Sequence, residues 1–183
     1  MDKQRRVLMT NEEVETKPAI ERRFLTRSSD WKKMRNEQAK LFIAQAYPEN
    51  LQDSGKVVRV RHTDGMGNTI YEQCEKGTTV GICTPEKEWL ISKANAEVLF
   101  SKCLIQCVRK WRWLIPLGSN LIAFVDEFTH IRNERSTMII SEVEFASEKQ
   151  GLAFIPPEWL GEEITGNNLY SNFGLAKNGE PLR

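Results

Sequence analysis

Charged residues recur two positions apart in short segments of this sequence, and the residues between them are often apolar. Side chains two positions apart in a β-strand point to the same face of a sheet. Each such segment therefore predicts a strand with one charged face and one apolar face. The pairs are Glu21 and Arg23, Arg59 and Arg61, Glu86 and Glu88, Lys110 and Arg112, and Glu142 and Glu144, with Lys76 and Asp126 as single additions.

Turn residues divide the chain into eight segments with the alternation of strands. These predicted strands cover residues 19–26, 40–47, 56–63, 69–77, 86–91, 104–115, 121–128 and 137–145. Helices are expected at 28–35, from a cap at Ser92 to about residue 103, and at 147–154. Many strands and few helices indicate a mainly β (α+β) protein, a single closed antiparallel β-barrel with helices packed outside. Residues 1–16 lack a consistent period and are expected to form an N-terminal tail or arm, so the barrel domain covers residues 17–183.

The composition excludes several other classes of protein. The chain has 183 residues and a net charge of +1, so we expect one globular domain without a specific nucleic-acid site. Its four cysteines form no Cys-x-x-Cys pair and make no zinc spacing with its two histidines, which favours free thiols in a reducing compartment. No apolar run approaches membrane-spanning length, and no apolar signal core is present at the N-terminus. A cytoplasmic protein without membrane association is therefore expected.

The charged faces have two interpretations. They could form the solvated face of a half-exposed sheet, with salt bridges across neighbouring strands. Alternatively, they could line the bore of the barrel, where each buried charge is costly unless it is paired, hydrated or bound to a ligand. A small-molecule triphosphate with Mg²⁺ or Mn²⁺ would use both signs, because Arg and Lys bind phosphate oxygens and carboxylates bind hard divalent cations. We therefore predict a charged bore that binds a triphosphate and a divalent metal.

Several motifs strengthen this prediction. The most specific is Pro156-Pro157-Glu158-Trp159-Leu160-Gly161-Glu162-Glu163-Ile164-Thr165-Gly166, followed by Tyr170-Ser171-Asn172. The others are Ala19-Ile20-Glu21-Arg22-Arg23-Phe24-Leu25, Val58-Arg59-Val60-Arg61, Lys76-Gly77, Glu86-Lys87-Glu88, Lys110-Trp111-Arg112 and Glu142-Val143-Glu144. With these motifs the chain resembles the CYTH family, also called triphosphate tunnel metalloenzymes, over about residues 18–177. That family includes class IV adenylate cyclases, thiamine triphosphatases and inorganic triphosphatases.

The resemblance implies a role for each group of charged residues. The basic residues would bind the triphosphate: Arg23, Arg59, Arg61, Lys76, Lys110 and Arg112. The acidic residues would bind metal or orient water: Glu21, Glu86, Glu88, Asp126, Glu142 and Glu144. We expect Glu142 and Glu144 to hold the metal for catalysis, and Glu21 to bind metal or the attacking water. The chain departs from the family pattern at four positions: Ala19 for Glu, Arg23 for Lys, Thr84 for Arg, and Phe124 for an acidic residue.

The leading hypothesis for function is a metal-dependent triphosphatase, in which the basic residues position the terminal phosphoryl group and a carboxylate orients the attacking water. An adenylate cyclase, in which a nucleotide hydroxyl attacks instead, is a related enzymatic alternative. The missing carboxylates at positions 19 and 124 also leave open a binding module that captures a nucleotide or polyphosphate without turnover. The sequence leaves open which triphosphate is bound and whether the chain forms a homodimer.

Overall fold

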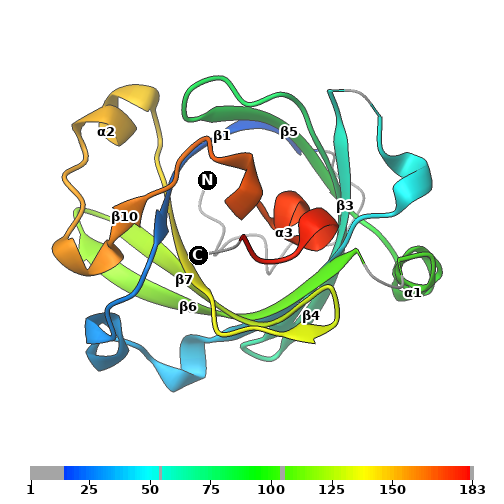
Figure 1. Cartoon of the computed structure of the whole chain (residues 1–183), viewed down its shortest axis with the longest axis horizontal. Helices are drawn as coiled ribbons and strands as arrows, with labels where there is room; N and C mark the ends of the chain where they lie inside the picture. The colour runs from blue at the N-terminus through cyan, green and yellow to red at the C-terminus, as the bar shows by residue number, and fades with distance from the viewer. Residues whose placement is uncertain (1–14, 54, 104–105, 182–183) are drawn as a thin grey trace.

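The computed structural model of the protein describes residues 15–53, 55–103 and 106–181. Eight antiparallel strands form a closed barrel in the order β1-β5-β4-β3-β2-β6-β7-β9, and β9 pairs with β1 to complete the ring. The barrel strands are β1 (Glu15–Leu25), β2 (Leu41–Ala46), β3 (Val57–Gly65), β4 (Asn68–Lys76), β5 (Cys83–Leu90), β6 (Cys107–Gly118), β7 (Leu121–Ile131) and β9 (Ile139–Glu144). Figure 1 shows this ring from one end, and it confirms the barrel predicted from the alternation of charged and apolar residues.

Shorter elements lie around the closed sheet and across one of its ends. The helices are α1 (Lys93–Ser101), α2 (Glu148–Ala153) and α3 (Asn172–Asn178), and two short strands are β8 (Glu134–Arg135) and β10 (Glu162–Glu163). Single 3₁₀ turns are η2 (Asp30–Lys33), η3 (Glu37–Ala39), η4 (Glu49–Leu51), η5 (Glu158–Leu160) and η6 (Asn168–Tyr170). Helices α1 and α2 begin at the predicted serines, because the side chains of Ser92 and Ser147 each accept a backbone N–H hydrogen bond.

Three differences from the predicted elements are local. The helix expected at 28–35 is only the 3₁₀ turn η2, whose N-cap Ser29 makes no side-chain cap bond. Helix α3 was not predicted, although it begins within the specific C-terminal motif. Strand β1 begins at Glu15, and residues 1–14 of the predicted arm lie outside the described residues.

Within the described ranges, no helix is long and apolar enough to cross a membrane.

The apolar positions between the charges pack on the outside of the barrel wall. A buried cluster there contains Phe24, Trp31, Trp113, Val125 and Leu160. The rings of Trp31 and Trp113 lie 6.1 Å apart, and the indole nitrogen of Trp113 donates to Glu127 Oε2 at 2.7 Å. Trp113 therefore belongs to the packed outer wall, and the charged side chains of the same strands face inwards.

A second apolar cluster anchors α3 at one end of the barrel. Leu175 and Ala176 of α3 are fully buried against Tyr47, Phe128 and Ile140. Figure 1 shows α3 lying across the opening of the ring of strands. Because apolar packing holds α3 there, this end of the bore is covered.

Candidate active site

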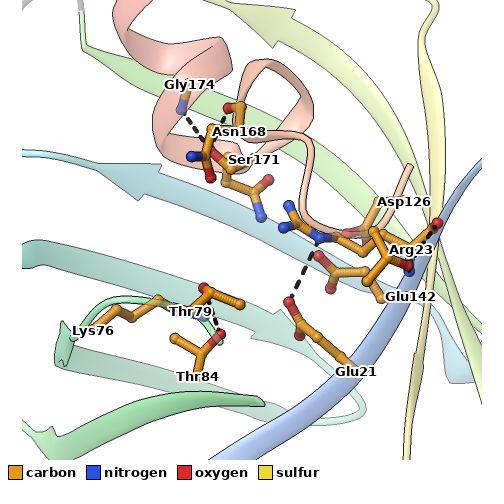
Figure 2. Close-up of polar contacts among 12 residues, drawn as sticks. Glu21, Arg23, Lys76, Thr79, Thr84, Asp126, Glu142, Asn168, Ser171 and Gly174 are labelled. Carbon is orange, nitrogen blue, oxygen red and sulfur yellow. Dashed lines mark hydrogen bonds and ion pairs between the residues drawn. The ribbon is translucent and has the colours of Figure 1, made fainter. Parts of the chain in front are cut away.

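The predicted charged side chains lie inside the barrel and pair mainly with one another. Figure 2 shows Glu21 and Arg23 of β1 beside Asp126 of β7 and Glu142 of β9, with Lys76 of β4 on the other side of Glu21. Arg59, Arg61, Lys110, Arg112, Glu88, Asp126 and Glu142 are all buried. The interpretation of these residues as the solvated face of a half-exposed sheet is therefore wrong, because the sheet closes on itself and the charged face becomes its interior.

Arg112 is the centre of the ion pairs on the β6–β7–β9 side of the bore. Its Nε and Nη2 donate to the two oxygens of Asp126, each at 2.7 Å, and Nη2 also donates to Glu142 Oε2 at 2.6 Å. Burial opposes the charge of Arg112, but the charges of Asp126 and Glu142 outweigh it and raise the pKa of the guanidinium. This bidentate, doubly paired guanidinium is fixed in orientation before any ligand arrives.

Lys110 lies beside Arg112 and is the most enclosed cation of the bore. It is fully buried, and its Nζ donates to Asp126 Oδ2 at 2.5 Å and to Asn172 Oδ1 of α3 at 3.0 Å. Burial lowers the pKa of Lys110 despite the neighbouring Asp126 carboxylate. Asn172 is a site residue that the strand pattern could not reveal, because α3 reaches the bore only through the tertiary fold.

Two arginines and two glutamates form the opposite, β3–β4–β5 side of the bore. Arg61 donates twice to Glu72 Oε2, at 2.6 and 2.9 Å, and once to Glu88 Oε1 at 2.7 Å. Arg59 donates to Glu88 Oε1 at 2.9 Å, while its buried Nε has no hydrogen-bond partner. A buried guanidinium N–H without a partner is unfavourable, so Arg59 retains a donor that an anionic ligand could satisfy.

Glu72 is a bore residue that the sequence analysis missed. Its Cα is paired with Arg61 across β3 and β4, and its side chain is buried. A signal was present, because positions 72, 74 and 76 share one face of the strand and Lys76 had already been assigned to the bore.

The corner formed by β1 and β9 brings carboxylates together. Glu21 lies opposite Glu144, and Arg23 lies opposite Glu142, in the β1–β9 ladder. Burial, and then the charge of Glu142, raise the pKa of Glu21. Arg23 Nε lies 3.6 Å from Glu21 Oε1 without a hydrogen bond, as the dashed ion pair in Figure 2 shows. The surroundings of Glu21 therefore oppose its charged form.

The remaining predicted residues complete the wall. Lys76 and Glu86 form an ion pair beside Glu21, and the charges of Glu21 and Glu86 raise the pKa of Lys76 although burial opposes this. Phe124 points into the bore, and its ring lies 5.0 Å from the Arg112 guanidinium. Phe124 is one of the four departures from the family pattern, and the Arg112 guanidinium already covers a face of its ring.

The donor set fits a divalent metal such as Mg²⁺ or Mn²⁺, because the bore offers carboxylate oxygens. In the described ranges no three acidic, histidine or cysteine side chains are grouped so that they could hold a metal by themselves. Mg²⁺ is usually bound by one or two carboxylates together with phosphate oxygens of a substrate. Glu21 of β1 and Glu142 and Glu144 of β9 lie on paired strands, and a metal held there would need phosphate oxygens of a substrate as further ligands.

Comparisons with known proteins agree with this geometry, although no family model matches the chain. The chain is 33% identical over 127 residues to the inorganic triphosphatase of Acetivibrio thermocellus, which covers 69% of this chain and 75% of that protein. It is 34% identical over 96 residues to the inorganic triphosphatase of Nitrosomonas europaea, which covers 52% of this chain and 62% of that protein. A solved inorganic triphosphatase is similar with a TM-score of 0.59 at 29% identity, over 86% of this chain and 93% of that one. A Hippeastrum protein described as an adenylyl cyclase with dominant triphosphatase activity has the same fold, with a TM-score of 0.61 at 16% identity over 90% and 97% of the chains.

A closed antiparallel barrel with a buried bore of both charge signs defines a tunnel protein built for a strongly charged ligand. This architecture and the similarity to the Acetivibrio protein together place the chain in a known family. The chain belongs to the CYTH family of triphosphate tunnel metalloenzymes, as its motifs predicted.

Proposed function

We propose that the protein hydrolyses inorganic triphosphate in its bore, together with a divalent cation. The observation that carries this proposal is the enclosed wall of paired arginines, lysines and carboxylates, which is covered by α3 at one end. The family membership supports it, because two relatives of this chain are named inorganic triphosphatases.

The charge of the bore supports a need for metal. Among the described residues, seven carboxylates face six cationic side chains, so the fully ionised wall carries a net charge of about −1. The carboxylates are Glu21, Glu72, Glu86, Glu88, Asp126, Glu142 and Glu144, and the cations are Arg23, Arg59, Arg61, Lys76, Lys110 and Arg112. A triphosphate adds several negative charges to this interior, and they need compensation in a medium of low dielectric constant. A divalent cation that enters with the substrate supplies it.

The side chains of the wall have three roles in this hydrolysis. Arg59 and Arg23, each with an unsatisfied buried Nε, donate to phosphate oxygens and fix the phosphate chain. Glu142 and Glu144 would hold the divalent cation, which would neutralise charge on the phosphate oxygens. Glu21 accepts a proton from the water as the water oxygen bonds to the terminal phosphorus. The bridging P–O bond then breaks, and pyrophosphate leaves with its electron pair.

The raised pKa of Glu21 suits this role. A carboxylate with a raised pKa is a stronger proton acceptor than an ordinary one, provided that it is ionised at the working pH.

Inorganic triphosphate is favoured over a nucleotide by the bore wall. Among the described bore residues, Phe124 is the aromatic ring best placed to stack on a base, but it is nearly buried and Arg112 already lies over it. Trp113 packs on the outside of the wall. In the part of the bore that the structure describes, charged groups are available for phosphates and no uncovered ring is presented to a nucleobase, which disfavours the adenylate cyclase alternative.

The proposal is tested by phosphate release from inorganic triphosphate and from ATP, each with Mg²⁺, with Mn²⁺ and with a chelator. Ligand-induced thermal shift is measured on the same samples. We expect metal-dependent turnover of inorganic triphosphate well above that of ATP. A thermal shift without turnover under any metal would instead support a binding module, and cyclic AMP formed from ATP would support a cyclase.

A further inference from the structure

Arg22 separates the site residues Glu21 and Arg23 along β1, and it points to the outside of the barrel. Its Nε and Nη2 donate to the two oxygens of Glu163, at 2.8 and 2.6 Å. Its Nη1 donates to the backbone carbonyls of Gly151 and Phe154, at 3.0 and 2.7 Å. The guanidinium also lies 5.7 Å from the Phe154 ring centroid. One side chain therefore ties β1 to α2 and to the C-terminal segment, more than 120 positions away in sequence.

The same C-terminal segment bonds directly to the backbone of Arg23. Strand β5 pairs with β1 only from Glu15 to Ile20, so this edge of β1 needs other partners beyond that point. Ile164 N donates to Arg23 O at 2.8 Å, and Arg23 N donates to Thr165 Oγ1 at 3.0 Å. Thr165 Oγ1 in turn donates to Glu163 Oε1 at 2.7 Å, which connects the backbone contact to the Arg22–Glu163 ion pair.

These contacts form a connected unit, the Glu163 clasp, made of Arg22, Glu163, Ile164 and Thr165. It holds both backbone groups of Arg23 and the side chain next to Glu21. It also accounts for the Glu163-Ile164-Thr165 part of the most specific motif in the sequence, to which the charged bore itself gives no role.

We infer that the Glu163 clasp is a positioning device for Glu21 and Arg23, with Arg22 and Glu163 as positioning residues that touch no substrate. This inference rests on the proposed function, in which those two bore residues act on the triphosphate. Rate depends steeply on such placement, because a displacement of about 1 Å at the reacting groups can cost about a hundredfold. A bidentate Arg–carboxylate pair supplies the fixed orientation that a lysine or an amide cannot.

The main test uses Glu163→Gln, with Glu163→Asp as the conservative variant and Asp30→Asn as the control. Asp30 forms an ion pair with Lys33 at 2.8 Å, but both side chains are exposed and neither belongs to the clasp. Steady-state kinetics with inorganic triphosphate are measured at a temperature where thermal melts show each variant to be folded. We expect kcat of Glu163→Gln to fall about tenfold to a hundredfold with a smaller change in KM. Glu163→Asp should recover part of kcat, and Asp30→Asn should match the wild type.

A second variant and a binding readout keep the outcomes distinct. Thr165→Val removes the acceptor for Arg23 N while keeping the size of the side chain, and it should lower kcat in the same direction. Calorimetry with inorganic triphosphate in chelator should show severalfold weaker binding for both variants, because Arg23 loses its fixed position. If the folded variants have wild-type kcat and affinity, the clasp is only structural and the inference is wrong. If the wild type binds triphosphate without turnover, the proposed function fails, and the binding comparison still decides the role of the clasp. A wild-type protein that neither binds nor hydrolyses inorganic triphosphate overturns both the proposed function and the inference about the clasp.

Discussion

Ala19 and Thr84 lie directly opposite each other in the β1–β5 ladder. They are the two positions at which the family pattern predicts Glu and Arg, so two departures that look independent in sequence are neighbours in space. The hydroxyl of Thr84 bonds to that of Thr79 at 2.8 Å, as Figure 2 shows. The two positions at which the resemblance implies an opposite-charge pair therefore hold two small uncharged side chains that face each other.

This pairing predicts that substitutions at the two positions are coupled. Ala19→Glu adds a carboxylate near Glu21, so we expect a lower melting temperature and weaker triphosphate binding in chelator. Thr84→Arg alone introduces a cation without its partner. The double variant should be more stable than the sum of the single effects by roughly 0.5–3 kcal/mol, as a double-mutant cycle of unfolding free energies would measure. Additive effects would show that the two positions do not interact.

Glu21→Gln should stabilise the protein while it abolishes turnover. The folded-state pKa of Glu21 is raised by burial and by Glu142. Protonated Glu21 therefore contributes fully to the free energy of unfolding below its unfolded-state pKa. This contribution is lost as pH rises through the folded-state pKa, because the buried carboxyl group must then ionise. We expect the variant to gain melting temperature relative to the wild type as pH rises, and to show no gain at low pH. Glu97→Gln on exposed α1 is the control. A constant difference between the melting curves at all pH values would contradict the raised pKa.

Arg59→Ala should weaken triphosphate binding far more than Lys32→Ala. Arg59 is buried and has an unsatisfied Nε, whereas Lys32 is a half-exposed side chain paired with Glu127 at 3.5 Å. A charge-assisted hydrogen bond contributes about 1.5–3 kcal/mol, and an exposed ion pair contributes about 0.2–1 kcal/mol. Calorimetry in chelator measures both affinities, and equal affinities for the two variants would remove Arg59 from the binding site.

Glu142→Gln and Glu144→Gln should affect metal-dependent turnover and metal-free binding in opposite directions. The amide keeps the size of the side chain but removes the negative charge that a hard divalent cation requires. It also removes repulsion toward phosphate, so affinity in chelator should be unchanged or higher while turnover with Mg²⁺ is lost. Full turnover in both variants would mean that β9 does not hold the metal. Glu142 also accepts from Arg112 at 2.6 Å, so its variant needs a melting curve beside the kinetics.

The amino-acid sequence determined much of this protein by itself, because alternation along a strand is a local property. A period of two in side-chain direction was enough to predict eight strands and to assign Arg59, Lys110 and Glu142 to one common set of faces. The serine caps of α1 and α2 were equally local, since each bonds to a backbone N–H three residues away.

Only the tertiary structure decided which charges meet. Closure of β9 onto β1 turned the charged faces into an interior and set Glu21 beside Glu144. The packing of α3 brought Asn172 to Lys110 across 62 positions, and the Glu163 clasp joined Arg22 to a residue 141 positions away. Such contacts depend on the path of the whole chain, because burial and ion pairing are fixed only when distant segments pack together, and local alternation carries no information about that path.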